Sequence, residues 1–475
     1  MAASSSPPAG ASPHLIAALT AVLPRGGLLF AEEDIRPYEC DALAAHTTLP
    51  LAVCLPETEA QVRDVLRVCH LLGVPVVSRG AGTGLSGGAM PHAGGVVLSL
   101  AKLNRILQVD PAARLVVAQS GATNQAVSDA AAPYGLYFAP DPSSQIVCTL
   151  GGNVAENAGG VHCVKYGLTV HHVVRVRALT SEGDVLEIGL QAPDAPGYDL
   201  LGLMNGSEGT LAVITEVTVR LLPKPAAARV ALASFGDISA AGAAVAAIFA
   251  AGIIPSGLEL MDKATIAAVS RYINAGYDPQ AEAVLLCEVD GTAEEVDADI
   301  AAASQVFATC GALQVRVSNS EGERQELWAG RKSAFPAVSA IKPDYYCLDG
   351  SIPRKRLAEM LTAIEAMSNK YGLSCINVFH AGDGNLHPLI LFDSREPGEW
   401  EQAMAFGGEI LEKTVAFGGA ITGEHGVGVE KLEYMAVQFS PAEMAILQGI
   451  RLAFDEAALL NPGKAVPAPT AEVTC

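Results

Sequence analysis

The feature that most constrains the fold of this chain is a glycine cluster between two apolar runs. Gly82-Thr-Gly84-Leu-Ser-Gly87 follows a predicted strand over Val74–Ser78, and it fits the G-x-G-x-x-G pattern of a Rossmann dinucleotide-binding unit. That unit requires a helix after the glycines, because the pyrophosphate binds at the helix N-terminus. Here the chain leads into a second predicted strand, Val96–Leu100, instead. We therefore predict a strand-to-strand loop whose backbone amides form an anion-binding nest, with a merely flexible loop as the alternative.

A second glycine-rich region comprises Pro140-Asp141-Pro-Ser-Ser144 and Gly151-Gly152-Asn153-Val-Ala-Glu-Asn157-Ala-Gly-Gly160. Small residues let a flat ring approach the backbone, and the asparagines offer the donors and acceptors that a flavin edge requires. A structural turn cluster would have the same composition. This region alone leaves both interpretations open.

The length of 475 residues predicts more than one domain. From about 50 to 222, short apolar runs alternate with glycine clusters, and the last of these runs, Leu211–Leu222, is predicted to be a strand. One helix is predicted from a Thr58–Gln61 capping box to Gly73, with Val62, Val65, Leu66 and Cys69 as its buried stripe. The prolines at 223 and 225 mark a boundary. Beyond it, apolar runs at 230–234, 283–289 and 313–317 alternate with helical stretches at 238–252, 293–310 and 355–370, which predicts a helix-covered sheet. The last fifty residues are expected to be helical with a turn.

Charge and cysteine usage exclude several classes of function. Thirty basic and 51 acidic side chains give a net charge of −21, which argues against nucleic acid as a partner. The ten cysteines lack the spacing of an iron–sulfur cluster or a cysteine-based zinc site and are expected to be reduced thiols of a cytoplasmic protein. The uncharged stretch Ile238–Ile254 is mostly Ala and Gly, so a packed helix is favoured over a membrane span. Residues 1–13 are expected to form a floppy tail.

Four motifs in order carry a family resemblance: the segment 79–88, the segment 140–144, the segment 151–160, and Gly206-Ser-Glu-Gly209 followed by Ile214-Thr-Glu216. Together they resemble the FAD-linked oxidases of the vanillyl-alcohol oxidase type over about residues 40–465. Within that family, Pro37-Tyr-Glu-Cys40, Trp328-Ala-Gly-Arg331 and Asn377-Val-Phe-His380 are similar to the glycolate oxidase (glycolate dehydrogenase) group.

The resemblance implies an α+β fold with a two-subdomain FAD-binding module, an α+β substrate cap and a short helical C-terminal segment. It implies a tail and lead-in over 1–45, an FAD-binding domain over 46–224, a cap over 225–420, a helical segment over 421–465 that returns to the flavin, and a tail over 466–475. Some relatives hold FAD covalently through His or Cys, and His92 and Cys148 lie near the flavin-like motifs. We expect non-covalent binding.

The resemblance also implies which residues hold FAD. The pyrophosphate is expected on the first loop, the isoalloxazine on the segments 140–144 and 151–160, and the adenosine on Glu208, Gly209 and Ile214, with Asn461 added from the C-terminal segment. The expected cofactor-binding residues are Arg79, Gly80, Ala81, Gly82, Thr83, Gly84, Ser86, Gly87, Pro140, Asp141, Ser144, Gly151, Gly152, Asn153, Asn157, Gly160, Glu208, Gly209, Ile214 and Asn461.

Two histidine-containing motifs predict a metal site. His380-Ala-Gly-Asp-Gly-Asn-Leu-His387 carries two imidazoles, and Gly423-Glu424-His425-Gly426 adds a carboxylate and a third imidazole. Two neutral imidazoles and a carboxylate suit zinc or a similar divalent ion with open positions, although the spacing is not that of H-E-x-x-H. Ordinary polar core residues are the alternative for an isolated histidine pair. The surrounding glycines, and the resemblance to metal-using D-2-hydroxy acid dehydrogenases, favour His380, His387 and Glu424 as ligands of zinc or manganese.

Two further residues are assigned to catalysis. His425 is expected to act as the general base that removes a hydroxyl proton, with a supporting hydrogen-bond role as the alternative. Arg331 is the best cation for an α-carboxylate, which it would hold through two parallel hydrogen bonds, and a surface ion pair is the alternative. Some relatives that act on larger diacids carry a lysine where this chain has Cys347, so a small monocarboxylate is expected.

We therefore expect oxidation of a small 2-hydroxy acid, glycolate or D-lactate, to the 2-keto acid. By resemblance, a smaller flavin-domain subunit and an iron–sulfur subunit would carry the electrons to a quinone. The chain itself is expected in the cytoplasm, and at most these partners would bring it to the inner face of the membrane. The alternatives are a stand-alone D-2-hydroxy acid dehydrogenase with a soluble acceptor, a non-redox ether-lipid transferase on the same flavin fold, and a silent FAD-binding subunit.

Overall fold

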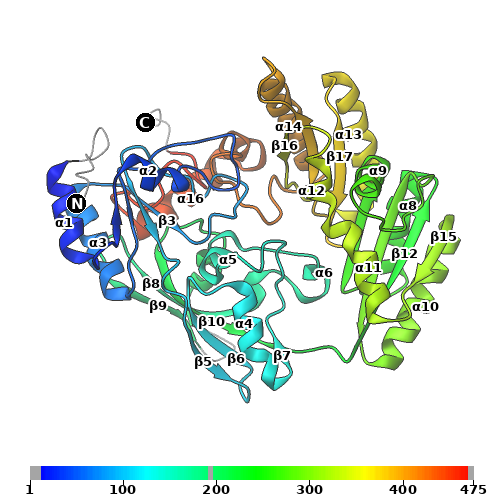
Figure 1. Ribbon diagram of the computed structural model, residues 1–475, viewed down its shortest axis with the longest axis horizontal. Coiled ribbons are helices and arrows are strands. Elements are labelled where there is room, and N and C mark those ends of the chain that lie inside the picture. The colour runs from blue at the N-terminus through cyan, green and yellow to red at the C-terminus, as the bar shows by residue number, and fades with distance from the viewer. Residues whose placement is uncertain (1–11, 191–195, 469–475) are drawn as a thin grey trace. The chain divides into compact units, whose positions relative to one another are not determined.

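The structure is a computed structural model, and it describes residues 12–190 and 196–468. The chain divides into two compact units. Unit 1 comprises residues 1–159, 168–224 and 424–475, and unit 2 comprises residues 160–167 and 225–423. The chain therefore passes between the units four times, after Gly159, Gly167, Lys224 and Gly423, and neither unit is continuous in sequence. The course of the chain can be followed by colour in Figure 1.

Unit 1 contains two main sheets. A four-stranded sheet has the order β1 (Leu28–Leu29), β2 (Ala52–Cys54), β4 (Val96–Ser99), β3 (Val76–Arg79). A five-stranded antiparallel sheet has the order β5 (Ile106–Asp110), β6 (Leu115–Gln119), β10 (Val213–Arg220), β8 (Val173–Leu179), β9 (Val185–Gly189). A short pair joins β7 (Leu136–Tyr137) to β11 (Leu222–Pro223). The helices of this unit are α1 (Pro13–Val22), α2 (Glu32–Ile35), α3 (Glu59–Leu72), α4 (Asn124–Ala131), α5 (Leu150–Glu156), α7 (Leu200–Met204), α15 (Met435–Gln438) and α16 (Pro441–Phe454).

Helix α3 shows how local sequence signals fix an element. Thr58 and Gln61 form the predicted capping box, and Gly73 ends the helix in the left-handed conformation at φ 62°. The predicted stripe of Val62, Val65, Leu66 and Cys69 is buried in the core beside the four-stranded sheet. The prediction of this helix is confirmed.

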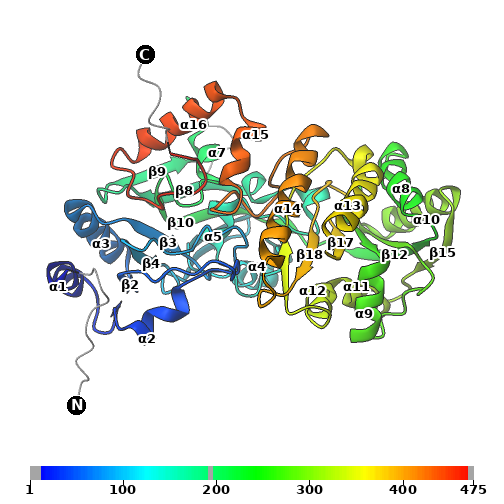
Figure 2. The ribbon, with the colours of Figure 1, turned by 90° about the horizontal axis from the view of Figure 1, so that it is seen from above.

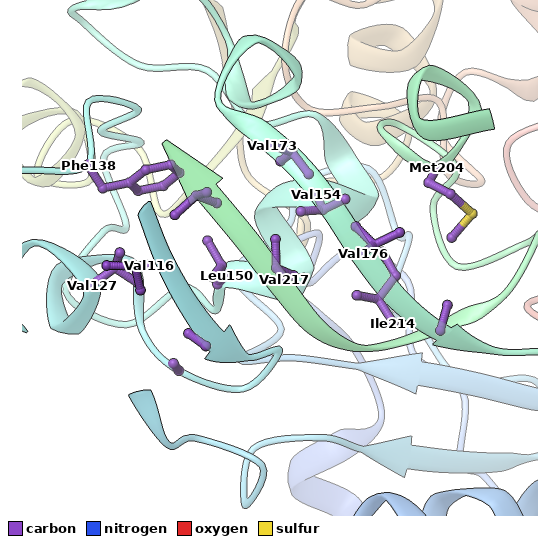
Figure 3. Close-up of a cluster of buried hydrophobic side chains, with 14 of the residues drawn as sticks. Val116, Val127, Phe138, Leu150, Val154, Val173, Val176, Met204, Ile214 and Val217 are labelled. Atoms are coloured by element: carbon purple, nitrogen blue, oxygen red, sulfur yellow. The ribbon is translucent and has the colours of Figure 1, made fainter. Parts of the chain in front are cut away.

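A second core lies beneath the five-stranded sheet, and it holds α5 in place. Leu150 and Val154, one turn apart on α5, are fully buried against Val116 of β6 and Val217 of β10 (Figure 3). Burial of a side chain of this size stabilises the fold by about 1.5–3 kcal/mol. The same helix carries Gly151, Gly152 and Asn153 on its first turn, so this core positions three of the residues expected to bind FAD.

Unit 2 is a seven-stranded antiparallel sheet covered by helices on both faces. Its order is β15 (Ala312–Val317), β12 (Ala227–Phe235), β14 (Ala283–Gly291), β13 (Gly257–Asp262), β17 (Cys375–Phe379), β18 (Pro388–Phe392), β16 (Asp344–Cys347). Figure 2 shows α8 (Ile238–Ala250), α10 (Ala293–Thr309), α13 (Leu357–Tyr371) and α14 (Glu399–Ala416) on one face of the sheet. Helices α9 (Lys263–Tyr272), α11 (Glu321–Lys332) and α12 (Ala334–Val338) lie on the other face. The short helix α6 (Cys163–Tyr166) also belongs to this unit.

The alternating strands and helices predicted after residue 225 are confirmed, with ends that shift by at most three residues. The alanine-rich stretch at 238–252 is α8, whose Ala241, Val245 and Ile248 are buried. None of the helices that the structure describes has both the length and the apolar composition needed to cross a bilayer. None of the nine cysteines in the described residues forms a disulfide.

Two expectations differ from the structure. Ser12 caps α1 through the amide of Leu15, and Pro13 begins that helix, so the expected tail is too long by two residues; its remainder, 1–11, lies outside the described residues, as does 469–475. The strand expected over Leu211–Leu222 is shorter, because β10 ends at Arg220 and Leu222 pairs with Tyr137 in a separate sheet.

Candidate flavin site and histidine cluster

The glycine loop joins two parallel strands directly. Strands β3 and β4 pair in parallel, and residues 80–95 between them form no helix, which confirms the predicted strand-to-strand loop. Arg79 at the end of β3 is buried, and its Nη1 donates to the carbonyls of Cys40 (2.7 Å) and Ala89 (3.3 Å). A Cβ at Gly82, where φ is 72°, would collide with the Arg79 guanidinium. Glycine is thus required for the loop to fold back over the arginine.

The segments expected to bind FAD converge within unit 1. A Cβ at Gly80 would strike the Thr149 hydroxyl, and a Cβ at Gly88 would lie 2.8 Å from Glu156, so the first loop packs on α5. The Asn461 Nδ2 donates to the carbonyls of Gly88 (2.9 Å) and Glu208 (2.6 Å). Residues far apart in sequence therefore surround one place in this unit, and we call them the flavin-loop cluster: residues 79–88, 149–157, 206–209 and 461–464.

Several buried polar atoms of this cluster lack a hydrogen-bond partner among the described residues. They are Glu156 Oε2, Ser207 Oγ and Asn461 Oδ1, together with Oδ1 of Asn124, whose Nδ2 donates to Pro140 O (2.9 Å) and Asn153 Oδ1 (3.1 Å). Protein interiors rarely leave such atoms unsatisfied unless a ligand or water supplies the bond. The donor set therefore fits a large polar cofactor such as FAD.

The segment that begins at Glu424 is anchored in the same cluster. The carboxylate of Glu208 accepts from the amides of Val427 and Gly428 at 2.7 Å each. The Ser86 hydroxyl donates to the His425 carbonyl (2.9 Å), and the Ser86 carbonyl accepts from the amide of Val429. A Cβ at Gly159 would lie 2.5 Å from a Glu424 carboxylate oxygen. Glu424 and His425 thus lie beside two of the loops expected to hold FAD.

Buried charges lie beneath these loops. Burial, together with the charge of Glu208, raises the pKa of Glu156 well above its usual value. Burial also raises the pKa of Glu208, although the two amide hydrogen bonds oppose this. Burial lowers the pKa of Lys464 to about 8, and its Nζ donates to the carbonyl of Gly88 (3.0 Å). A charged cofactor bound beside these groups would shift the pKa values of all three.

Some of the expected FAD residues have visible structural roles. Asn157 ends α5 in the left-handed conformation, and its Oδ1 accepts from the amide of Val170 (2.9 Å). Ile214 on β10 packs in the core of the five-stranded sheet. Gly160 belongs to unit 2. Ala81, Thr83 and Gly84 are half-buried on the first loop, and Ser144 is half-buried after Asp141.

In unit 2, the two histidines of the first motif lie side by side. The rings of His380 and His387 are 5.0 Å apart between centroids and almost perpendicular, and both are buried. The Nδ1 of His387 lies 3.2 Å from the Leu348 carbonyl, and the Nδ1 of His380 lies 2.7 Å from Glu259 Oε1. A carbonyl or carboxylate oxygen only accepts, so each Nδ1 carries the hydrogen in its bond. In the neutral form of each ring, Nε2 then has the lone pair that a metal ligand needs, and the histidines fit a divalent ion.

Arg331, at the end of α11, is buried and not on the surface. Its Nε donates to Glu259 Oε2 at 2.8 Å. Burial alone raises the pKa of Glu259, but the charges of His380 and Arg331 and their hydrogen bonds outweigh burial and lower it. Glu259 is therefore ionised between the two groups. Arg331 therefore forms an ion pair, as in the expected alternative, but this pair with Glu259 is buried and not on the surface.

Family models match both parts of the chain. Residues 50–189 match a model described as "FAD binding domain", and residues 224–465 match one described as "FAD linked oxidases, C-terminal domain". The chain belongs to the FAD-linked oxidases. As a member of this family it is an FAD-dependent oxidoreductase, which confirms the expected family and the expected FAD.

Relatives of this FAD-linked oxidase cover almost all of it. Glycolate oxidase subunit GlcD of Escherichia coli K12 is 53% identical over 95% of this chain and 91% of its own length. D-lactate dehydrogenase of Anaerostipes hadrus is 33% identical over 95% of this chain and 97% of its own length. The solved 4-ethylphenol oxidase of Gulosibacter chungangensis has 17% sequence identity and a TM-score of 0.80 over 98% of this chain and 99% of that one. The expected α+β fold of the vanillyl-alcohol oxidase type is confirmed.

Sequence reasoning missed four polar residues of this oxidase. Asn124 joins Pro140 to Asn153, and Glu259 joins Arg331 to His380. Asp349 accepts from Thr422 Oγ1 (2.6 Å) and the Gly423 amide, and one of its carboxylate oxygens lies within 4.8 Å of a His387 ring nitrogen. Glu288 is a second buried carboxylate beneath α11. None of the four stands in a glycine- or histidine-rich motif. They are recognised only by their hydrogen bonds to residues that are distant in sequence.

Proposed function

We propose that this chain oxidises a small 2-hydroxy acid to the corresponding 2-keto acid, with glycolate as the preferred substrate and D-lactate as the alternative. The observation that carries this proposal is the 53% identity to a glycolate oxidase subunit over nearly the whole chain. The D-lactate dehydrogenase at 33% identity supports the same chemistry on a substrate with one more carbon.

FAD supplies a hydride acceptor when it is bound. We infer that residues 79–87 of the first loop bind its pyrophosphate, that the segments 140–144 and 151–157 face the isoalloxazine, and that Glu208, Gly209 and Asn461 bind toward the adenosine. The buried polar atoms of Ser207 and Asn461 that lack partners among the described residues support this assignment. The buried thiol of Cys148 and the exposed ring of His92 are not needed for it, so the cofactor is held without a covalent bond.

A divalent metal, zinc or manganese, supplies a Lewis acid for the substrate hydroxyl when it is bound. Its proposed ligands are His380, His387 and Glu424. The two Nδ1 hydrogen bonds support this ligand set, because they fix the histidines as the tautomer that offers Nε2.

Arg331 and His425 are the groups proposed to act on the substrate itself. Arg331 donates to Glu259 through Nε, which leaves its terminal nitrogens able to bind a carboxylate through two parallel bonds. His425 lies in the segment held by Ser86 and Glu208, beside the loops proposed to hold the flavin. Its imidazole is the base that takes the hydroxyl proton.

Electrons then have to leave the reduced flavin. The E. coli and Bacillus subtilis relatives are each named as a subunit of glycolate oxidase. We propose that a second flavin-domain subunit and an iron–sulfur subunit receive the electrons from this chain and pass them to a quinone, at the inner face of the membrane where the partners lie.

Anaerobic titration of the purified flavoprotein with glycolate, D-lactate and L-lactate tests the reaction. Glycolate is expected to bleach the oxidised flavin spectrum, because reduction removes its visible absorbance. A non-redox transferase or a silent FAD-binding subunit would keep the flavin oxidised with all three acids, and that result would refute the proposal.

Two changes test the assigned groups. His425→Ala is expected to lower the rate of flavin reduction by roughly 10²–10⁴ with FAD still bound, and an unchanged rate would remove the base assignment. Removal of metal with a chelator is expected to abolish reduction without loss of FAD. Full activity of the metal-free protein would refute the Lewis-acid role.

A further inference from the structure

Glu259 is the one carboxylate among the described residues that touches both Arg331 and His380. It lies on β13, in the middle of the seven-stranded sheet, and is fully buried. Its Oε2 accepts from Arg331 Nε (2.8 Å), and its Oε1 accepts from His380 Nδ1 (2.7 Å). Both oxygens of this carboxylate are therefore used.

The sheet register explains why Glu259 meets His380. Strands β13 and β17 are antiparallel, with Leu260 opposite Phe379 and Met261 opposite Val378. One more step along this register places Glu259 opposite His380, and the Gly382 amide donates to the Leu258 carbonyl just beyond (2.9 Å). Cross-strand neighbours are held at close and fixed separation. The contact is thus determined by the strand pairing and not by a flexible loop.

Helix α11 brings Arg331 to the same carboxylate from the face of the sheet. Arg324, Trp328 and Arg331 stand at spacings of four and three residues on one side of this helix. Arg324 Nη1 and Trp328 Nε1 donate to Glu288 of the neighbouring strand β14, at 2.7 and 2.6 Å. A buried carboxylate on the sheet therefore holds each end of this helix face, but only Glu259 also contacts a histidine of the proposed metal site.

We propose that Glu259 is a positioning residue that sets the tautomer of His380 and the orientation of Arg331 together. The inference rests on the proposed function, in which His380 binds a metal and Arg331 binds the substrate carboxylate. A carboxylate acceptor keeps the hydrogen of His380 on Nδ1 and its lone pair on Nε2. It also fixes the plane of the Arg331 guanidinium through Nε, which leaves the two terminal nitrogens to bind the substrate carboxylate. One side chain then governs metal affinity and carboxylate binding.

The test compares Glu259→Gln with Glu288→Gln. Arg331 and His380 contact different oxygens of Glu259, and Glu259→Gln replaces one of these oxygens with an NH2 group, which donates and does not accept, so one of the two hydrogen bonds is lost in this geometry. We expect Glu259→Gln to weaken Zn²⁺ and Mn²⁺ binding by on the order of 10- to 100-fold, and to raise the KM for glycolate by about tenfold with a smaller change in kcat. Glu288→Gln removes a matched carboxylate under the same helix and is expected to leave both quantities unchanged.

Arg331→Gln provides a second variant that does not disturb the bond from His380 to Glu259. It is expected to raise the KM for glycolate without weakening metal binding. Metal affinity is measured by calorimetry on the FAD-loaded protein without substrate, with circular dichroism and the flavin spectrum as checks on folding. If Glu259→Gln binds metal as tightly as the unchanged protein, or if Glu288→Gln weakens it equally, the positioning role is refuted.

Failure of the proposed function would look different. If the unchanged protein binds metal but glycolate and D-lactate do not reduce its flavin, the substrate assignment fails, while the metal titrations still decide whether Glu259 positions His380. If the unchanged protein takes up neither ion, the role of Glu259 toward His380 is refuted together with the metal site.

Discussion

At the scale of single residues, the flavin-loop cluster of unit 1 contains three buried ionisable side chains with shifted pKa values. Glu156 and Glu208 both have raised pKa values, and Lys464 has a lowered one, because burial disfavours the charged form of each. Glu208 differs from Glu156, since its two oxygens accept backbone amides, whereas Glu156 Oε2 has no partner in the part of the chain that the structure describes. Hydrogen bonds therefore offset part of the cost of burying the Glu208 carboxylate, whereas no such bond from a described residue to Oε2 offsets the cost at Glu156.

Replacement by glutamine distinguishes the two carboxyls. The folded pKa of Glu156 lies above its unfolded value, so ionisation destabilises the fold as the pH rises above about 4.5. Glu156→Gln stays neutral and is expected to raise the free energy of unfolding of FAD-free protein by about 1–2 kcal/mol at pH 7. Glu208→Gln loses an acceptor for a buried amide and is expected to lower it by about 1–3 kcal/mol. Urea unfolding followed by circular dichroism measures both, and changes of the same sign would contradict this account.

Lys464 predicts a dependence of stability on alkaline pH. Its folded pKa of about 8 lies below the unfolded value of 10.5, so the folded chain releases the proton first as the pH rises. This lysine therefore destabilises the fold below pH 8, and the cost disappears between pH 8 and 10.5. We expect the free energy of unfolding of FAD-free protein, relative to Lys464→Met, to increase by about 3 kcal/mol over that interval. If the free energies of unfolding of the two proteins change in parallel with pH, Lys464 does not carry a destabilising buried charge.

At the scale of elements, local signals and distant contacts determine different helices. Helix α3 was predictable because its capping box, apolar stripe and terminal glycine all lie within the segment itself. Helix α5 was not, since two glycines in its first turn weaken any helical signal, and burial of Leu150 and Val154 against a distant sheet decides the outcome. His380 and Arg331 were named from sequence motifs, whereas Glu259 stands in no such motif and is recognised only by its hydrogen bonds to partners 121 and 72 residues away.

The N-caps of two neighbouring helices test whether α5 supports the flavin loop. Thr149 Oγ1 accepts from the Gly152 amide at the start of α5 (3.2 Å), and Thr123 Oγ1 accepts from the Ala126 amide at the start of α4 (3.1 Å). Thr149→Ala and Thr123→Ala are each expected to lower the free energy of unfolding by about 1 kcal/mol.

Only the Thr149 side chain also packs against Gly80 of the first loop. FAD affinity, measured by fluorescence titration of FAD-free protein, is therefore expected to fall several-fold in Thr149→Ala and to stay constant in Thr123→Ala. An equal loss of FAD affinity in both variants would mean that helix stability, and not the contact with the loop, controls binding.

At the scale of the whole molecule, both units depend on chain that is distant in sequence. Residues 160–167 belong to unit 2, where His162 Nε2 lies 3.1 Å from Glu288 Oε1 and Lys165 pairs with Asp290 at 2.6 Å. Unit 1 in turn includes residues 424–475, whose Leu460 lies in the core beside the four-stranded sheet. Neither unit is therefore a simple N- or C-terminal fragment. Domains given as consecutive ranges of the sequence do not describe this fold, because each unit is built from separate segments.

Truncation at the C-terminus separates the two units experimentally. A chain that ends at Phe439 lacks α16, Leu460, Asn461 and Lys464, and so loses the bonds from Asn461 to Gly88 and Glu208. We expect it to retain no FAD after gel filtration, whereas a chain that ends at Ala468 keeps every one of these contacts and is expected to retain FAD fully.

Tryptophan emission reports on the other unit in the same two proteins. Both tryptophans of the chain, Trp328 and Trp400, belong to unit 2, and the hydrophobic core around Trp328 contains no described residue beyond Leu391. Because this core is complete without the C-terminal segment, the emission maximum is expected to stay the same after truncation at Phe439. A red shift equal to that of the urea-unfolded chain would show that unit 2 needs the C-terminal segment in order to fold, and the two units would then have to be treated as one cooperative body.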